Sequence, residues 1–411
     1  MRQRVQPGKM RALTAPTGRQ LIIAAAAIGA LGPFGMHTLL PALPAIAADF
    51  RAAPATIQWT ISLSLVAIAL GNLLVAPLSD RYGRRPVTIA GLVLYLLGSL
   101  AGSLAGDVAT LVVARCVQAF GAGAAMAVAR ASLSDFFGLE RSASALASTA
   151  TVVLLVPMLA PTLGGFTVEW LGWRHVFTAA LAVGTLVTAF TLFGTRETHA
   201  ADRGAGAPLR SFTSYRQLLG HREYLGHVFY GAAMMGSVTV FITSAPYVAI
   251  EVYGVKPSTY GLLFMLPALA SFSGFFFTSR MAGRLGAERM MRMGTTLTCL
   301  GGLALLTGHL AGLEHPLAVL IPGMLVCAAN ALSAPNSTAS AIRAAPNVAG
   351  AASGLLGFTQ LLVGAIATQL VAFAAHGTAT PLVVAILCLN LAAALLLRAN
   401  RRVRARGVSP T

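Results

Sequence analysis

The chain has 411 residues, of which 56% are apolar and only 10% are charged, and its mean hydropathy is +0.75. Soluble domains carry about 25% charged residues, so this composition excludes a protein that covers itself with a water-facing surface. The formal net charge is +17, but the basic residues occupy short segments between apolar runs, which argues against a nucleic-acid partner and for a lipid bilayer.

Twelve apolar segments are long enough to cross a bilayer, since each crossing needs about 20 residues. Backbone groups in lipid must hydrogen-bond within their own segment, so each crossing is predicted to be a helix. The predicted fold class is therefore an all-α membrane protein of two six-helix bundles. Its predicted spans are residues 20–43, 56–78, 86–105, 109–132, 143–167, 174–194, 224–249, 258–279, 291–310, 316–338, 348–373 and 379–398.

A polar, glycine-containing stretch from Thr195 to Arg222 separates six spans from six. Transporters are often built from such repeated halves. A trace of the repeat remains, because Gly83-Arg-Arg in the first half is echoed by Gly286-Ala-Glu in the second, with Gly283 in the place of Asp80. The predicted domains are a basic arm 1–19, an N-terminal bundle 20–194, a linker 195–222, a C-terminal bundle 223–398 and a basic tail 399–411.

The distribution of Lys and Arg predicts the orientation of the chain. Most of the 29 basic residues lie on the side that holds the linker and both termini. Positive loops stay in the cytoplasm, so we expect a multi-pass protein of a bacterial inner membrane with both ends inside. The arginine-rich tail from Arg398 to Arg406 is expected to lie against anionic lipid.

A tight charged turn, Asp80-Arg-Tyr-Gly83-Arg84-Arg85, joins the second and third spans. It resembles the corresponding loop of the major facilitator superfamily, whose pattern is Gly-x-x-x-Asp-Arg-x-Gly-Arg-Arg; only the leading glycine is replaced, by Ala76. An ordinary positive-inside loop is the alternative. The resemblance implies a conformational switch in which Asp80 lies near the start of the eleventh helix and Arg84 pairs with an acid at the end of the fourth. The gate residues it implies are Asp80, Arg81, Gly83, Arg84, Arg85 and Asp135.

The fourth span contains Arg115-Cys-Val-Gln118, which looks like a superfamily motif whose Arg and Gln face the central cavity. A charge within a span is costly and usually lines a wet cavity. The alternative is that Arg115 snorkels to the outer interface.

The fifth span contains Ala160-Pro161-Thr-Leu-Gly164-Gly165, which resembles the antiporter motif Gly-Pro-x-x-Gly-Gly. Proline kinks a helix, and glycines let a neighbouring helix approach closely. The resemblance marks an exporter, whereas plain helix packing is the alternative.

Further stretches narrow the resemblance to one subfamily. They are Leu40-Pro-Ala-Leu-Pro44, Arg130-Ala, Gly172-Trp-Arg174 and the start of the eleventh span up to Gln360. Together they are similar to the bicyclomycin and chloramphenicol resistance group of twelve-helix drug:proton antiporters. This implies a monomeric secondary active efflux transporter, with drugs and protons as partners, the proton gradient as energy source and no cofactor.

The residue at position 37 differs from the pattern of that group. Its members commonly carry an aspartate in the first helix, where this chain has His37. His37 is either the proton-carrying group, because its ordinary pKa of about 6.5 suits that task, or a neutral imidazole bonded to a backbone carbonyl. A pathway with Arg115 and His37 but no central acid favours neutral or weakly anionic amphipathic drugs. Other candidate pathway residues, each of which could instead bond between helices, are Gln58, Asn72, Gln118, Tyr247, Asn330 and Gln360.

Other functions are less compatible with the sequence. No Gly-x-x-x-x-Gly-Lys-Ser/Thr segment is present, which argues against ATP hydrolysis. The four cysteines and eight histidines show no metal-ligand or disulfide spacing, which argues against a membrane enzyme or receptor. An exporter or importer of a small metabolite, such as an amino acid or sugar, remains the alternative on the same fold.

Overall fold

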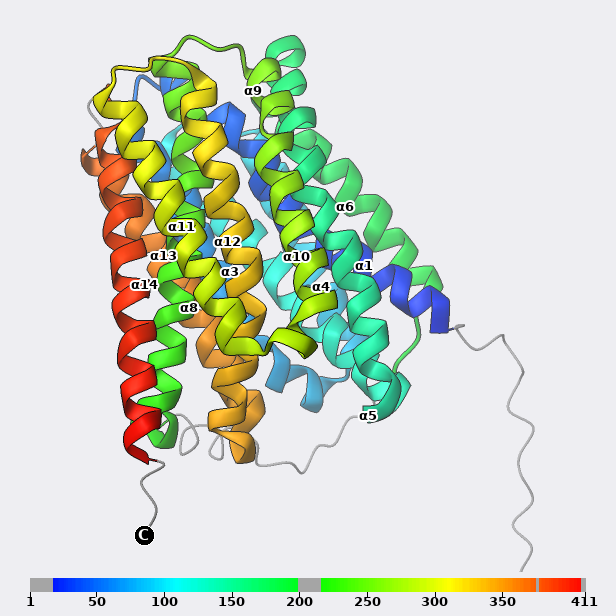
Figure 1. Cartoon of the computed structure of the whole chain (residues 1–411). Coiled ribbons are helices and arrows are strands. Elements are labelled where there is room, and N and C mark those ends of the chain that lie inside the picture. Colours follow the sequence, from blue (N-terminus) through cyan, green and yellow to red (C-terminus); the bar gives the residue numbers. More distant parts are fainter. Residues whose placement is uncertain (1–17, 199–215, 375–376, 408–411) are drawn as a thin grey trace, which may run out of the picture.

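The computed structural model describes residues 18–198, 216–374 and 377–407, which fold into long helices arranged side by side (Figure 1). Within these residues, eleven helices are long and apolar enough to cross a membrane. The helices are α1 (Gly18–Leu39), η1 (Leu40–Ala42), α2 (Leu43–Asp49), α3 (Pro54–Tyr82), α4 (Arg84–Ser103), α5 (Val108–Leu171), α6 (Arg174–Gly194), α8 (Arg222–Tyr247), η2 (Val248–Val252), α9 (Pro257–Leu263), α10 (Met265–Leu285), α11 (Ala287–Leu310), α12 (Pro316–Ala344), η3 (Pro346–Val348), α13 (Ala349–Ala374) and α14 (Thr380–Gly407).

The predicted spans 109–132 and 143–167 both belong to α5. The chain reverses at Gly138, whose φ of 68° lies in the left-handed region that glycine adopts without steric cost. The two crossings are Val108–Gly138 and Ser144–Leu171. Asp107 caps the first crossing, because its carboxylate accepts hydrogen bonds from the backbone N–H and the hydroxyl of Thr110, and these bonds lower the pKa of Asp107.

The predicted span 291–310 forms α11, which is the one predicted crossing that is not among the eleven apolar helices. Its first turns carry Glu288, Arg289 and Arg292, and glycines and threonines follow, so its hydropathy is low. α11 nevertheless has 24 residues and packs against α12 and α14. It therefore completes the C-terminal bundle.

The observed helix ends can be compared with the predicted boundaries of the arm, the linker and the tail. α6 ends at Gly194 and α8 begins at Arg222. Most of the predicted basic arm and residues 199–215 of the linker lie outside the described residues. α14 continues to Gly407, so the first part of the predicted tail extends the last helix instead of forming a separate segment. Arginine and alanine are good helix formers, which explains the extension.

The two halves turn in the same way at the positions of the sequence echo. Gly83, between α3 and α4, has a φ of 94°, and Gly286, between α10 and α11, has a φ of 78°. Each glycine N–H closes the preceding helix, on the carbonyls of Ser79 and Ala282 respectively. A side chain would be strained at either position, so the repeat is preserved in the backbone although its charges differ.

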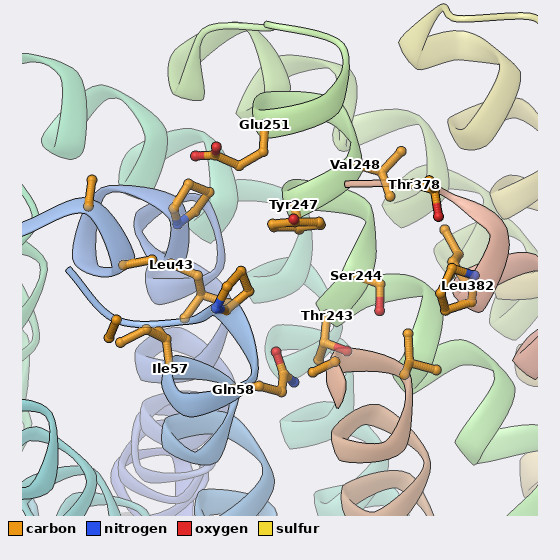
Figure 2. A pocket seen from close by; sticks show the side chains of 18 of the residues that line it. Leu43, Ile57, Gln58, Thr243, Ser244, Tyr247, Val248, Glu251, Thr378 and Leu382 are labelled. Carbon is orange, nitrogen blue, oxygen red and sulfur yellow. The ribbon is translucent and has the colours of Figure 1, made fainter. Parts of the chain in front are cut away.

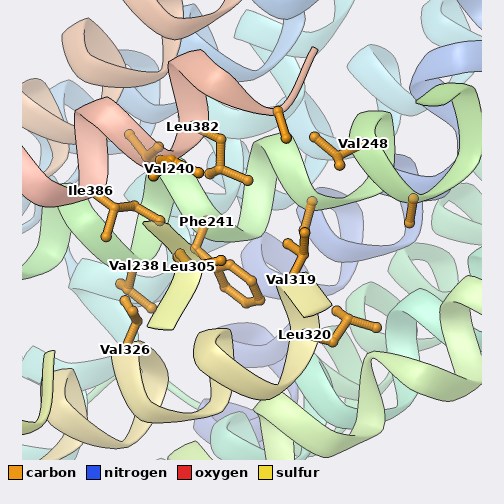
Figure 3. Packing of buried hydrophobic residues seen from close by; sticks show 14 of the residues in the cluster. Val238, Val240, Phe241, Val248, Leu305, Val319, Leu320, Val326, Leu382 and Ile386 are labelled. Carbon is orange, nitrogen blue, oxygen red and sulfur yellow. The ribbon is translucent and has the colours of Figure 1, made fainter. Parts of the chain in front are cut away.

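Each half has its own apolar core. In the C-terminal half, Phe241 of α8, Leu305 of α11 and Ile386 of α14 pack together with Val and Leu side chains of α12 (Figure 3). Buried hydrogen bonds also join helices of this half: the side-chain oxygen of Asn390 accepts hydrogen bonds from Ser237 and Thr298, each at 2.9 Å. Such interhelical bonds hold helices together in lipid, where apolar burial alone provides little drive.

Glycines set the closest helix contacts within a half. A Cβ on Gly98 of α4 would lie 2.6 Å from the Cα atom of Gln118 on α5, whereas one on Gly357 of α13 would meet nothing within 4 Å. We predict that Gly98→Ala destabilises the protein by about 1–3 kcal/mol, because the α4 and α5 backbones must move apart. Gly357→Ala should be neutral or slightly stabilising, since alanine favours helix. Unfolding in a denaturing detergent titration measures both, and equal stability of the two variants would contradict the prediction.

Candidate functional site

The two ends of the molecule differ in what they hold. We call the end with the Gly83 turn the inner end and the opposite end, where α2 meets α3, the outer end; the outer end is at the top of Figure 1, with α9. The inner end carries a charged cluster within the N-terminal half. The outer end is where the two halves meet, through α3 on α13 and α5 on α9.

Arg84 is the centre of the inner charged cluster. Its side chain is 9% exposed and forms ion pairs of 2.6 Å with Asp80 and 2.8 Å with Asp135. It also donates a hydrogen bond to the Ser79 hydroxyl. The predicted pair between Arg84 and Asp135 is therefore present, and it joins the α3–α4 turn to α5. A planar guanidinium suits this role because its donors point in several fixed directions.

Glu197 completes this cluster, and the sequence analysis did not single it out. Its carboxylate accepts the backbone N–H groups of Arg84 at 2.9 Å and of Arg85 at 3.0 Å. These are the first residues of α4, where free N–H groups and the helix dipole favour an anion. Arg85 in turn donates to the carbonyl of Leu192. These contacts join the α3–α4 turn to the end of α6. The acidic residue directly after the sixth span was the sequence signal that could have pointed to them.

The other two predicted gate residues of the turn lie on its exposed side. Arg81 is exposed and its guanidinium stacks over the Tyr82 ring. Asp80 is 44% exposed, and in the part of the chain that the structure describes no hydrogen bond or ion pair joins it to α13. The charged cluster is therefore held within the N-terminal half.

Arg115 lies inside the N-terminal half and does not snorkel, since it is only 3% exposed. One of its terminal nitrogens donates to the Gly35 carbonyl of α1 at 3.2 Å and to the Gln118 amide oxygen. Gln118 then donates to Ser99 of α4 at 2.7 Å. The predicted residues Arg115 and Gln118 thus link α1, α4 and α5. Two buried polar groups nearby, the Nε of Arg115 and the hydroxyl of Tyr95, have no hydrogen-bond partner among the described residues.

His37 is 7% exposed and lies in the last turn of α1. Its ring centre is 6.4 Å from that of Phe264, so the side chain faces the C-terminal half. Its buried Nδ1 has no hydrogen-bond partner within the described ranges.

The proline and glycine segment of α5 forms part of the outer closure. Gly164 lies against the backbone of Thr38 in α1, and Gly165 lies against the backbone of Pro257 in α9. The Thr162 hydroxyl donates to the carbonyl of Gly261 at 2.9 Å, which joins the halves directly. A Cβ on Gly261 would in turn lie 2.6 Å from the Pro161 carbonyl oxygen. The segment therefore packs helices within the N-terminal half at Gly164 and across the boundary between the halves at Thr162 and Gly165.

A second group of contacts closes the outer end between α3 and α13. Ser62 donates to the Gln369 side chain at 3.0 Å, and Gln369 donates to the carbonyl of Ala55 at 2.9 Å. Gln369 is 5% exposed. The sequence analysis named Gln360 in the same span but not Gln369. Both are glutamines within an apolar segment, so the same criterion could have identified Gln369.

A cavity of about 330 Å³ lies between the halves at the outer end (Figure 2). Gln58 of α3 faces it from one half, and Thr243, Ser244 and Tyr247 of α8 face it from the other. The Gln58 amide nitrogen is buried without a hydrogen-bond partner in the described chain. Tyr247, a predicted pathway residue, therefore belongs to this outer cavity.

The remaining predicted pathway residues lie elsewhere and do not converge on one pocket. Asn330 is on α12, and Gln360 of α13 lies beside Gly231 of α8, whose added Cβ would be 2.8 Å from the Gln360 amide nitrogen. The described residues contain no group of three or more His, Cys, Asp or Glu that could hold a metal ion.

Two helix bundles that close against each other at one end, with a charged turn at the other, define a multi-pass membrane carrier. The chain belongs to the Major Facilitator Superfamily, whose family model matches residues 25–368. The bicyclomycin resistance protein homolog of Haemophilus influenzae is 30% identical over 356 residues, which are 86% of this chain and 88% of that protein. The chloramphenicol resistance protein of Pseudomonas aeruginosa is 31% identical over 377 residues, covering 89% and 86%.

Solved structures agree on the fold. The xylose transporter XylE of E. coli, in a partially occluded inward open conformation, superposes with a TM-score of 0.74 at 14% identity, over 93% of this chain and 97% of that one. The predicted fold class is thus confirmed. The chain is a multi-pass protein of the bacterial inner membrane, and its family consists of transporters.

The ion pairs of Arg84 should stabilise the inner end measurably. We predict that Arg84→Gln lowers the free energy of unfolding by about 1–2 kcal/mol, because it leaves two partly exposed carboxylates without their cation. Arg81→Gln removes the same charge from the same turn at an exposed position and should change stability by less than about 0.5 kcal/mol. Detergent unfolding titrations measure both variants. Similar losses in the two would show that net charge, and not the Arg84 pairs, matters.

Proposed function

We propose that this protein is a secondary active exporter of drugs. The observation that carries the proposal is the match over 86–89% of the chain to two relatives named for bicyclomycin and chloramphenicol resistance. Pro161, Gly164 and Gly165 lie at the outer end, which must open to release an exported substrate and equally to admit an imported one. Fold alone would not distinguish drug export from metabolite transport.

The mechanism we propose is alternating access. The structure has its outer end closed by α5 on α9 and by α3 on α13. Export requires these contacts to separate while the inner end closes. In the closed inner state we propose that Asp80, now partly exposed, meets the N-terminus of α13, where a helix dipole favours a carboxylate. The termini would then lie in the cytoplasm, and the transporter would act as a monomer driven by protons.

The charges within the bundles favour certain substrates. Among the described residues, the buried basic side chains include His37, Arg84 and Arg115, and none of the buried side chains is a carboxylate. Glu251 lines the outer cavity and is exposed, but a permanent cation beside Arg115 would find no buried counter-charge and would be repelled, whereas a neutral or weakly anionic molecule would not. We therefore propose neutral or weakly anionic amphipathic drugs as substrates.

Expression of the chain in an efflux-deficient host tests the function. We predict that it raises the inhibitory concentration of chloramphenicol more than that of ethidium, a permanent cation. A matched loss-of-function control is Gly165→Val, whose side chain would collide with the Pro257 backbone of the other half and prevent outer closure. Resistance that is greatest for ethidium would contradict the substrate proposal. Transport of only a sugar or an amino acid would favour the metabolite alternative.

The proton-carrying group we propose is His37. We predict that His37→Ala abolishes the pH-gradient dependence of drug uptake into inverted vesicles but leaves drug binding in place, because the titrating imidazole is lost. His175→Ala, at an exposed position at the start of α6, is the control and should behave as wild type. Unchanged pH-driven uptake in His37→Ala would assign the proton to another residue.

A further inference from the structure

A second cavity lies on the outside of the C-terminal bundle, between α11 and α14. It encloses about 360 Å³ and is separate from both ends of the transport pathway described above. Each helix lines it with a single face, because the lining residues recur at helical spacing. They are Arg292, Thr295, Thr296 and Cys299 of α11, and Ala394, Leu397, Arg398 and Arg401 of α14.

The charge of this groove is concentrated at its inner end. Three arginines converge there from the two helices. The rest of the groove is lined by Thr295, Thr296, Cys299, Ala394 and Leu397. Glu288 pairs with Arg401 at 3.0 Å. Arg292 and Arg398 form no ion pair or hydrogen bond with any residue that the structure describes. The groove therefore presents two guanidinium groups without a partner in the described chain, next to a lining of threonine, cysteine, alanine and leucine side chains.

The groove opens toward lipid at the depth of the headgroups. The outward faces of both helices carry exposed apolar side chains, Leu300 and Leu303 on α11 and Leu391 and Leu395 on α14. α11 has 24 residues and so is about 36 Å long, longer than the roughly 30 Å hydrocarbon layer. Arg292 lies in its second turn from the inner end, so the arginines reach the boundary between hydrocarbon and headgroup.

We propose that this groove binds an anionic phospholipid of the inner leaflet. The headgroup phosphate would accept hydrogen bonds from Arg292 and Arg398, and an acyl chain would lie along Leu397 and Ala394. Arginine is suited to phosphate because its planar fork of donors matches the phosphate oxygens. Basic pockets between membrane helices on the cytoplasmic side have the chemistry that recognises such headgroups. The site depends on neither the drug pathway nor the inner gate.

Native mass spectrometry of the full chain, titrated with phosphatidylglycerol or phosphatidylcholine, tests this inference. Wild type should retain phosphatidylglycerol preferentially. The double variant Arg292→Gln/Arg398→Gln should bind it about 30-fold more weakly, since each basic residue contributes roughly a fivefold factor. Glu288→Gln should tighten binding by about fivefold, because it frees Arg401.

The controls separate a site from general charge. Arg280→Gln/Arg289→Gln removes two exposed arginines from the same end of the molecule, outside the groove, and should bind as wild type. Arg292→Lys/Arg398→Lys should recover most of the affinity and shows that the positions tolerate substitution. Equal losses in the two glutamine pairs, or displacement of the lipid by millimolar inorganic phosphate, would overturn the proposal of a lipid site.

Discussion

The architecture depends on close backbone contact between the two halves at the outer end. Gly165 of α5 and Gly261 of α9 have no side chain, so these helices of opposite halves lie directly against each other, while Gly164 lets α5 lie against α1 within its own half. In lipid this close packing replaces the apolar drive that holds soluble domains together. The polar group around Gln369 adds hydrogen bonds beside it. The close approach of α5 and α9 at the outer end therefore requires residues without a side chain at positions 165 and 261.

The fold could be predicted almost completely from the sequence, because lipid leaves a chain so few choices. Apolar length alone located the crossings, including α11, whose arginines and threonines place it below a strict hydropathy limit. The helix ends were less predictable. α14 extends to Gly407 beyond its apolar segment, because helix propensity continues where hydropathy stops.

The candidate site was only partly predictable. The ion pair of Arg84 with Asp135 followed from the resemblance, which implies an acid at the end of the fourth helix as the partner. Arg115 and Gln118 were expected to face a central cavity, and their hydrogen bond to each other was not predicted. Glu197 and Gln369 were missed because their partners are distant in sequence, and only the packing of α6 on α4 and of α13 on α3 brings them together. The pathway candidates were chosen as polar residues in apolar spans. That criterion does not say which way a side chain points, and Tyr247 and Gln360 accordingly lie in different places.

The turns at Gly83 and Gly286 show that the two halves of a repeat can keep one backbone shape and differ in charge. Both copies retain the backbone shape, but Gly283 stands where the first copy has Asp80. The repeat is thus kept in the backbone geometry, whereas its ion pairs differ: Arg84 pairs with Asp80 and Asp135 in the first half, and Glu288 pairs with Arg401 in the second. The inner end therefore holds a buried arginine with two acidic partners in the N-terminal half and an exposed ion pair in the C-terminal half. A compound that binds at the inner end would consequently meet different side chains on the two halves and could bind to one half selectively.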